Sequence, residues 1–299
     1  MDICYGSSGY RYRRQALAGS ATLRGMPATV PSHQAAVVGF KLWRPHRFDG
    51  VALVIGSAVP DAAYALTGLG VDVRSHAWHA LFWFDTPLTW LLAVLVRRAA
   101  PYVVAHLPNA GPLGLGDYGV LAAVRHPAAV TAYSAFLGAL SHQLWDTVTH
   151  PYVLIGDPFL GPGTHLPGMH VVAFAGLPWW RVVQLASELV GVTVVAAAAI
   201  HIGRTGRLRE WHGPAPTVSR RPRVFWPVAV VVGAVLAGIA LALPRNDLVN
   251  VAGSRALIAL TVALLAAAAA VRFSAGGATS PKLPPRTGPE AATSAKSGP

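Results

Sequence analysis

The sequence holds a single cysteine, Cys4, among its 299 residues. One cysteine can form no disulfide within the chain, and it cannot supply the several thiolates of a Cys-based zinc site. Any metal ion bound here would therefore need ligands from histidine, aspartate and glutamate. Charged residues are also scarce, at 12% of the chain, against about 25% in ordinary soluble domains.

Most of the sequence consists of long apolar runs. Hydrophobic residues make up 53% of the chain and the mean hydropathy is +0.45, a composition that belongs in a lipid bilayer. The net charge of +12 would suggest nucleic acid in a soluble chain, but here the arginines cluster in short segments between the apolar runs. Because the aromatic residues lie inside those runs, we expect a lipid bilayer and no nucleic acid as partner.

The alternation of apolar runs with basic clusters predicts an all-α, polytopic transmembrane bundle of about six spans, with a short helix over 32–43 before them. The spans are expected at 51–66, between 75 and 98, and at 128–146, 179–200, 224–243 and 255–271. By the positive-inside rule, the basic segment 204–223 and the tail lie in the cytoplasm and the loop 147–178 lies outside.

Composition also predicts the division of the chain. Residues 1–25 are expected to be a disordered leader, because they lack the apolar core of a secretory signal, and Met26 is an alternative start. Residues 26–203 are expected to form the membrane domain with the functional site, and 204–223 a basic cytoplasmic loop. The pair of spans in 224–272 reads as scaffold or as an appended pair, and 273–299 as a disordered tail.

The stretch SHQLWDTVTH, residues 141–150, carries the strongest chemical signal. On an α-helix, His142, Asp146 and His150 share one stripe, as metal ligands would. The first and last of them lie about 12 Å apart along a straight helix, so one ion can bind only one adjacent pair. Pro151 is expected to end the helix, which favours His142 with Asp146 as that pair. The alternative is a polar helix end at the membrane surface that needs no metal.

Other polar residues stand in the apolar runs. Asp61 follows Pro60 at an expected helix break, and a carboxylate within a membrane is a functional candidate by default, although a helix cap is the alternative. His76 and His79 are spaced to share a helical face. Under the six-span arrangement these residues gather at the outer ends of the spans, together with the polar residues of span 179–200, which are Gln184, Ser187 and Glu188.

The remaining histidines carry weaker signals. His33 joins the same side only if helix 32–43 enters the membrane from outside. His165 and His170, in a Gly/Pro-rich loop, could reach a metal, whereas His106 and His126, in the Pro/Gly-rich stretch 99–126, are expected to be solvated.

Five motifs occur in order: MPATVPSHQAAV, VIGSAVPDAAY, SHAWHALFWFDTPL, GALSHQLWDTVTH and VQLASELVG. Together they resemble the bacterial domain-of-unknown-function 4184 family, over about residues 26–203. That family is similar in turn to inner-membrane proteins described as metal-dependent hydrolases. The resemblance implies a multi-pass protein of the bacterial inner membrane and the metal ligands His33, Asp61, His76, His142 and Asp146, with His150 as an addition. It implies nothing for the leader or for the C-terminal third.

Two functions follow from these observations. The first is a membrane-embedded hydrolase that uses a divalent metal ion, zinc before others, on a lipid or lipid-linked phosphoester, with Asp61 or Glu188 as general base. The second is a non-catalytic metal-binding membrane protein or an ion- or proton-coupled permease. No repeat relates the two halves of the sequence, and this counts against a permease.

Overall fold

The computed structural model describes residues 30–109, 111–149, 168–169, 171–244 and 248–274. The described chain is mostly helical. Its α-helices are α2 (Val30–Trp43), α3 (Gly50–Gly56), α4 (Val59–Ala62), α5 (Thr86–His106), α6 (Ala128–Thr149), α7 (Trp179–Thr205), α8 (Arg207–His212), α9 (Pro222–Ala242) and α10 (Leu248–Ser274). Tighter or wider turns form η2 (Ala63–Leu66), the π-helix η3 (Leu81–Asp85) and the 3-10 helix η4 (Leu115–Ala122), and β1 (Val172–Phe174) pairs antiparallel with β2 (Leu177–Pro178).

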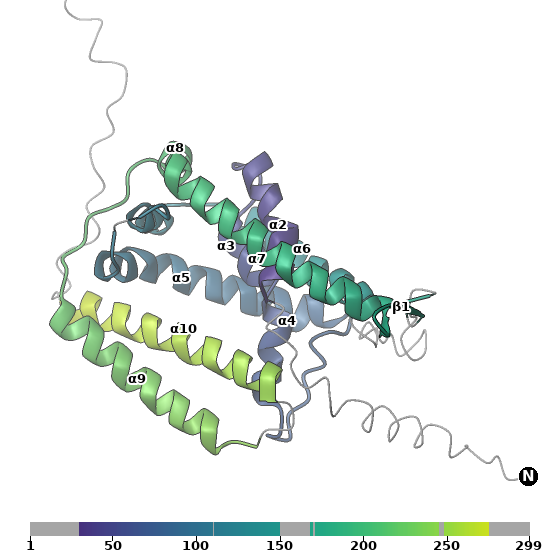
Figure 1. Cartoon of the computed structure of the whole chain (residues 1–299). Coiled ribbons are helices and arrows are strands. Elements are labelled where there is room, and N and C mark those ends of the chain that lie inside the picture. Colours follow the sequence, from purple (N-terminus) through teal and green to yellow (C-terminus); the bar gives the residue numbers. More distant parts are fainter. Residues whose placement is uncertain (1–29, 110, 150–167, 170, 245–247, 275–299) are drawn as a thin grey trace, which may run out of the picture.

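The helices pack as one bundle. In Figure 1, α9, α10 and α5 lie side by side, and α7 runs across α2 and α6. The short helix α3 packs against α6, and η4 against α5. Helix 32–43 of the sequence prediction is α2, which begins two residues earlier, at Val30.

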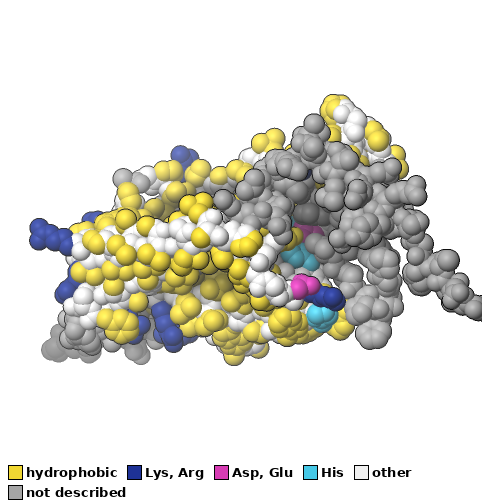
Figure 2. Space-filling view, turned by 90° about the horizontal axis from the view of Figure 1, so that it is seen from below, with side chains coloured by type: hydrophobic (Ala, Val, Ile, Leu, Met, Phe, Trp, Pro, Cys, Tyr) yellow, Lys and Arg dark blue, Asp and Glu magenta, His cyan; other side chains and the backbone are white. Residues whose placement is uncertain are grey.

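Among the residues that the structure describes, four helices are long and apolar enough to cross a membrane: Leu81–His106, Trp179–Thr205, Pro222–Ala242 and Asn250–Ser274. Large apolar side chains stand exposed along them, such as Leu189, Val230 and Leu260. Figure 2 shows this apolar surface, with most of the visible Lys and Arg side chains at one end and His and acidic side chains at the other. These features indicate a membrane protein.

The expected number of six spans is not confirmed. Run 51–66 does not form one helix, because it breaks into α3, α4 and η2. Pro60 lies in the first turn of α4, where its missing N–H costs nothing, and the Ser57 hydroxyl bonds back to the Val54 carbonyl. Run 128–146 is a continuous helix, α6, but because of its polar residues it is not among the helices apolar enough to cross a membrane.

The stretch 99–126 also differs from its prediction. Helix α5 continues through Pro101 to His106, and His106 is buried instead of solvated. Its Nε2 accepts a hydrogen bond from the Arg221 backbone N–H over 2.8 Å, and its ring stacks on Phe225 with centroids 4.4 Å apart. His106 is therefore a packing residue that joins α5 to α9.

The C-terminal helices are integral to the bundle and are not an appended pair. Helix α10 packs on α9 and α5 and also on α4 and η2. The Ser254 hydroxyl donates to the Asp61 carbonyl over 2.9 Å, and the buried Arg255 guanidinium donates to the carbonyls of Ala65 and Thr67 over 3.0 and 2.8 Å. Since these carbonyls belong to the segment just after the α3 break, α10 fixes the position of Asp61.

Candidate metal centre

Helix α6 presents His142 and Asp146 on its buried face. They lie one turn apart, and both side chains are almost fully shielded from solvent. The predicted pair thus points into the bundle and not toward lipid. His150, the third member of the predicted stripe, lies outside the residues that the structure describes, as do His165 and His170.

The break after α3 places a carbonyl and a carboxylate beside this face. Gly56 and Gly138 let α3 and α6 approach until a Cβ atom on Gly138 would lie 2.5 Å from the Leu53 carbonyl oxygen. The Ser57 carbonyl then accepts a hydrogen bond from His142 Nδ1 over 2.8 Å. Asp61 follows on α4, one turn further along the chain.

Four ligand atoms converge at this point. The Nε2 atoms of His76 and His142 are 3.3 Å apart. Asp61 Oδ1 lies 3.4 Å from each of these nitrogens, and Asp146 Oδ2 lies 3.5 Å from that of His76 and 3.4 Å from that of His142. These separations are longer than ordinary hydrogen bonds of about 2.7–3.2 Å, so the atoms are close without being well paired to one another.

The partners of the other ring nitrogens fix the tautomers of both histidines. His142 Nδ1 faces a carbonyl, which can only accept, so this nitrogen carries the proton. The Ser75 hydroxyl donates its one proton to the Pro60 carbonyl over 2.7 Å, and it therefore accepts from His76 Nδ1 over 3.1 Å. In the neutral form of each ring, Nε2 carries the lone pair and points toward the other Nε2.

Two nitrogen lone pairs and two carboxylate oxygens facing one another require a positive charge among them. A shared proton bridges two of these atoms at a time, whereas a divalent cation can interact with several at once. For bonds of about 2.0–2.1 Å, neighbouring ligand atoms of a tetrahedral zinc site lie about 3.3–3.4 Å apart, close to the distances found here. The Nδ1–H bonds to a carbonyl and a hydroxyl are also the outer contacts that metal-binding histidines usually make.

His33 reaches the same centre from α2. Its Nε2 lies 3.5 Å from Asp146 Oδ1, and its ring stacks on that of His142 with centroids 3.8 Å apart. Helix α2 brings it there because α7 packs closely on α2, where a Cβ atom on Gly191 would lie 2.4 Å from Ser32 Cα. The two His/Asp groups able to hold an ion, His33 with Asp61 and His142, and His76 with His142 and Asp146, thus join α2, α4, α6 and the turn at His76.

Other candidates do not join the centre. His79 was expected to share a helical face with His76, but residues 75–79 form turns, and His79 instead accepts a hydrogen bond from the Trp83 indole N–H over 3.0 Å. Glu188 is buried on α7, outside both His/Asp groups. Gln184, also buried on α7, accepts a hydrogen bond from Arg181.

Two residues that support the centre were missed from the sequence. The Gln143 amide donates to the Ser75 carbonyl over 3.1 Å and to Asp85 Oδ2 over 3.3 Å, and both side chains are fully buried. This link holds the turn that carries His76 against α6. Asp85 lies at the end of the π-helix η3, an element often found at functional sites, and its isolated acidic character in an apolar run was the available signal.

Comparison with known protein families identifies the family of this chain. The family described as Domain of unknown function (DUF4184) matches residues 26–274. The chain belongs to the DUF4184 family. The match includes α9 and α10, so the expected end of the resemblance near residue 203 was too early. No curated protein matches the chain, and neither does any solved structure.

Proposed function

We propose that this DUF4184 protein binds a divalent metal ion, zinc before others, and uses it to hydrolyse a lipid or phosphoester-type substrate near the membrane surface. The observation that supports it most is the opposed pair of Nε2 atoms of His76 and His142, 3.3 Å apart and flanked by two carboxylates. The ligands in this proposal are His33, Asp61, His76, His142 and Asp146, with His150 as a further candidate.

A zinc ion in such a set lowers the pKa of a bound water to about 7 and polarises a phosphoryl or acyl oxygen. The residues of the chain divide the remaining tasks. His76, His142 and Asp146 would hold the ion, and the contacts of the two histidines with Ser75 and Ser57 orient their rings. Asp61 is the most accessible member, with 16% of its side chain exposed against 5% for Asp146, so it stands where water and substrate would approach. We assign the general base to Asp61, with Glu188 on α7 as the alternative.

The membrane setting supports a lipid or lipid-linked substrate. The surface around the long helices is apolar, and the histidine and acidic side chains lie at the end away from most basic side chains (Figure 2). With the basic end in the cytoplasm, this multi-pass protein of the bacterial inner membrane would open its site toward the outer leaflet. Reporter fusions in the 204–223 segment test this orientation, and activity of a periplasm-specific reporter at that segment would reverse it.

The experiment that tests metal binding compares two single variants of the detergent-purified full chain. Element analysis after dialysis should find about one tightly bound ion per chain in the unmodified protein and in His79→Ala, and far less in His142→Ala. His79 is the matched control because it lies near His76 in the chain, belongs to neither His/Asp group and accepts a hydrogen bond from the Trp83 indole instead. Equal metal contents in the three proteins would refute the proposed site.

A second function is favoured by the burial of the ligands. The side chains of His33, His142 and Asp146 are at most 5% exposed, which resembles the closed sites of structural metals more than the open sites of catalytic ones. The chain would then be a non-catalytic metal-binding protein or an ion-coupled permease. Hydrolysis of an activated phosphodiester by the metal-loaded protein, lost in Asp61→Asn after that variant has been reloaded to the same metal content, would favour the enzyme. Metal binding with no such turnover would favour the second function.

A further inference from the structure

A cavity lies near the other end of α2, away from the metal centre. It has a volume of about 340 Å³, near the lower end of the roughly 300–1,000 Å³ typical of small-molecule pockets. None of the five proposed metal ligands lines it. His33 and Lys41, which belong to the two sites, are eight residues or about 12 Å apart along α2. We call this space the basic-end cavity; its walls come from α2, α3, α5, η4, α7 and α8.

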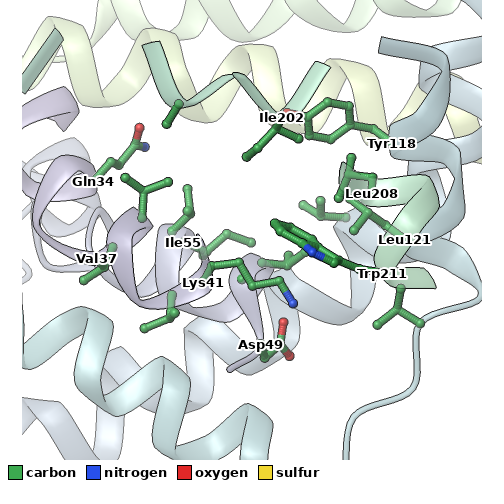
Figure 3. Close-up of a pocket in the computed structure, with 18 of the residues that line it drawn as sticks. Gln34, Val37, Lys41, Asp49, Ile55, Tyr118, Leu121, Ile202, Leu208 and Trp211 are labelled. Carbon is green, nitrogen blue, oxygen red and sulfur yellow. The ribbon is translucent and has the colours of Figure 1, made fainter. Parts of the chain in front are cut away.

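Most of the wall is aliphatic. Figure 3 shows Val37, Ile55 and Ile202 around the cavity, with Leu121 and Leu208 beside them. Apolar side chains from four helices and from η4 thus line a space that offers little to a strongly hydrated ligand. The wall suits an alkyl chain.

One margin of the cavity is charged. Figure 3 places the Lys41 amine near the Asp49 carboxylate and beside the Trp211 ring, whose centroid lies 5.4 Å from Lys41 Nζ. Arg97 forms an ion pair with Asp49, which also accepts a hydrogen bond from the Thr131 hydroxyl over 2.8 Å. Asp49 is therefore paired with Arg97, and two cationic side chains, those of Lys41 and Arg97, lie beside one carboxylate.

Among the described residues, Lys41 has no carboxylate of its own at this margin, because its neighbour Asp49 is paired with Arg97. Its amine donates to the carbonyls of Pro45 and Phe48 over 2.6 and 3.1 Å, which use two of its three N–H groups and carry no charge. Burial lowers the pKa of Lys41 to about 8, partly opposed by Asp49, so the amine is still protonated at neutral pH. Burial also lowers the pKa values of His126 and His212, which line the same cavity and stay neutral there.

We propose that the basic-end cavity binds a single-chain amphiphile with one negative charge, a long-chain carboxylate, with its alkyl chain along the aliphatic wall and its carboxylate at Lys41. One positive charge in excess matches one carboxylate, and the volume suits one chain better than the two chains and headgroup of a phospholipid. The proposal does not depend on the metal centre.

The test uses the full chain in phosphatidylcholine nanodiscs and a fluorescent polyene fatty acid as probe, with empty nanodiscs as the blank. Saturable binding of about one probe per chain is expected, displaced by dodecanoate and at least about tenfold less effectively by dodecanol, because the alcohol cannot form the charge-assisted hydrogen bond. Equal displacement by the two compounds would overturn the assignment of an anion, and the lack of saturable binding would overturn the site.

Variants locate the probe. Lys41→Met should weaken dodecanoate binding about tenfold or more and leave dodecanol nearly unchanged, whereas Lys41→Arg keeps the charge and should bind. Ala199→Phe fills the cavity and should abolish binding, whereas Ala197→Phe makes the same change on the exposed face of α7 and should not. A monodisperse elution profile and an unchanged melting temperature identify the variants that fold. Binding that persists in folded Ala199→Phe, or disappears in folded Ala197→Phe, would overturn the proposal.

Discussion

His142 Nδ1 donates a hydrogen bond to the Ser57 carbonyl over 2.8 Å, joining α6 to the chain break after α3. One contact thereby sets the proton on His142, aims its Nε2 at His76, and ties a ligand helix to the segment that carries Asp61. The proposed metal centre therefore depends on residues that are not among its ligands.

Ser75→Ala should weaken metal binding about 10- to 100-fold, because it removes the hydroxyl that accepts the His76 Nδ1 proton and orients the ring. Competition with a chromophoric zinc chelator measures the affinity. Ser141→Ala is the matched control, since its hydroxyl bonds only to the Gly138 carbonyl of its own helix although it lies next to His142. Equal loss in both variants would contradict an orienting role of Ser75.

Gly138→Ala should also impair metal binding, although Gly138 is no ligand. An added methyl group would lie 2.5 Å from the Leu53 carbonyl oxygen and push α3 away from α6, lengthening the bond from His142 to Ser57. Thermal unfolding and metal content should fall together. Gly238→Ala on α9 is the control, because nothing lies within 4 Å of its added carbon, and it should leave both unchanged.

Arg255→Met should lower the melting temperature by several degrees. The substitution leaves the carbonyls of Ala65 and Thr67 without their buried donor, a cost of about 1–3 kcal/mol. Because those carbonyls follow Asp61, we also expect weaker metal binding. Arg272→Met, an exposed position near the end of the same helix, should change neither quantity.

Stability should fall as the pH drops from about 6.5 toward 4, in part through His212. Burial lowers the pKa of His212 to about 4 in the folded chain, and the charge of Lys41 adds to this effect. The unfolded chain therefore takes up the proton first, so the stabilisation is complete above pH 6.5 and is lost as the pH falls toward the folded pKa. His212→Gln should flatten this part of a melting-temperature profile recorded with chelator present, whereas His201→Gln, at an exposed position on α7, should retain the slope of the unmodified protein.

The sequence predicted the parts of the centre that depend on local spacing. The four-residue step from His142 to Asp146 places both on one helical face wherever the helix lies, and a Pro-Asp pair in an apolar run marks a break. His33 could not be placed in this way, because its position depends on the packing of α2 against α7 at Gly191. The pairing of His76 with His79 was wrong because it assumed a helix where the chain makes turns.

The number of spans could not be predicted for a related reason. Hydropathy measures whether a segment could face lipid, but α3, α4 and α6 bury much of their surface against other helices and against each other. Gly56 and Gly138 have apolar surroundings in the sequence, yet their role is close backbone contact. The same contact produces the site, so the departure from six regular spans and the convergence of ligands have one physical origin.

The hydrogen bonds from Ser254 and Arg255 to the segment around Asp61 join residues about 190 positions apart in the chain. The ribosome synthesises α2 first and α10 last. His33 is therefore in the translocon or bilayer for most of synthesis before Ser254 and Arg255 can bond to the segment around Asp61. Metal capture should then be a late event in biogenesis, following insertion of the final helix. Only a chain that has been synthesised and inserted completely would then bind the ion. Membrane quality-control proteases could therefore distinguish complete chains from truncated ones by their metal content.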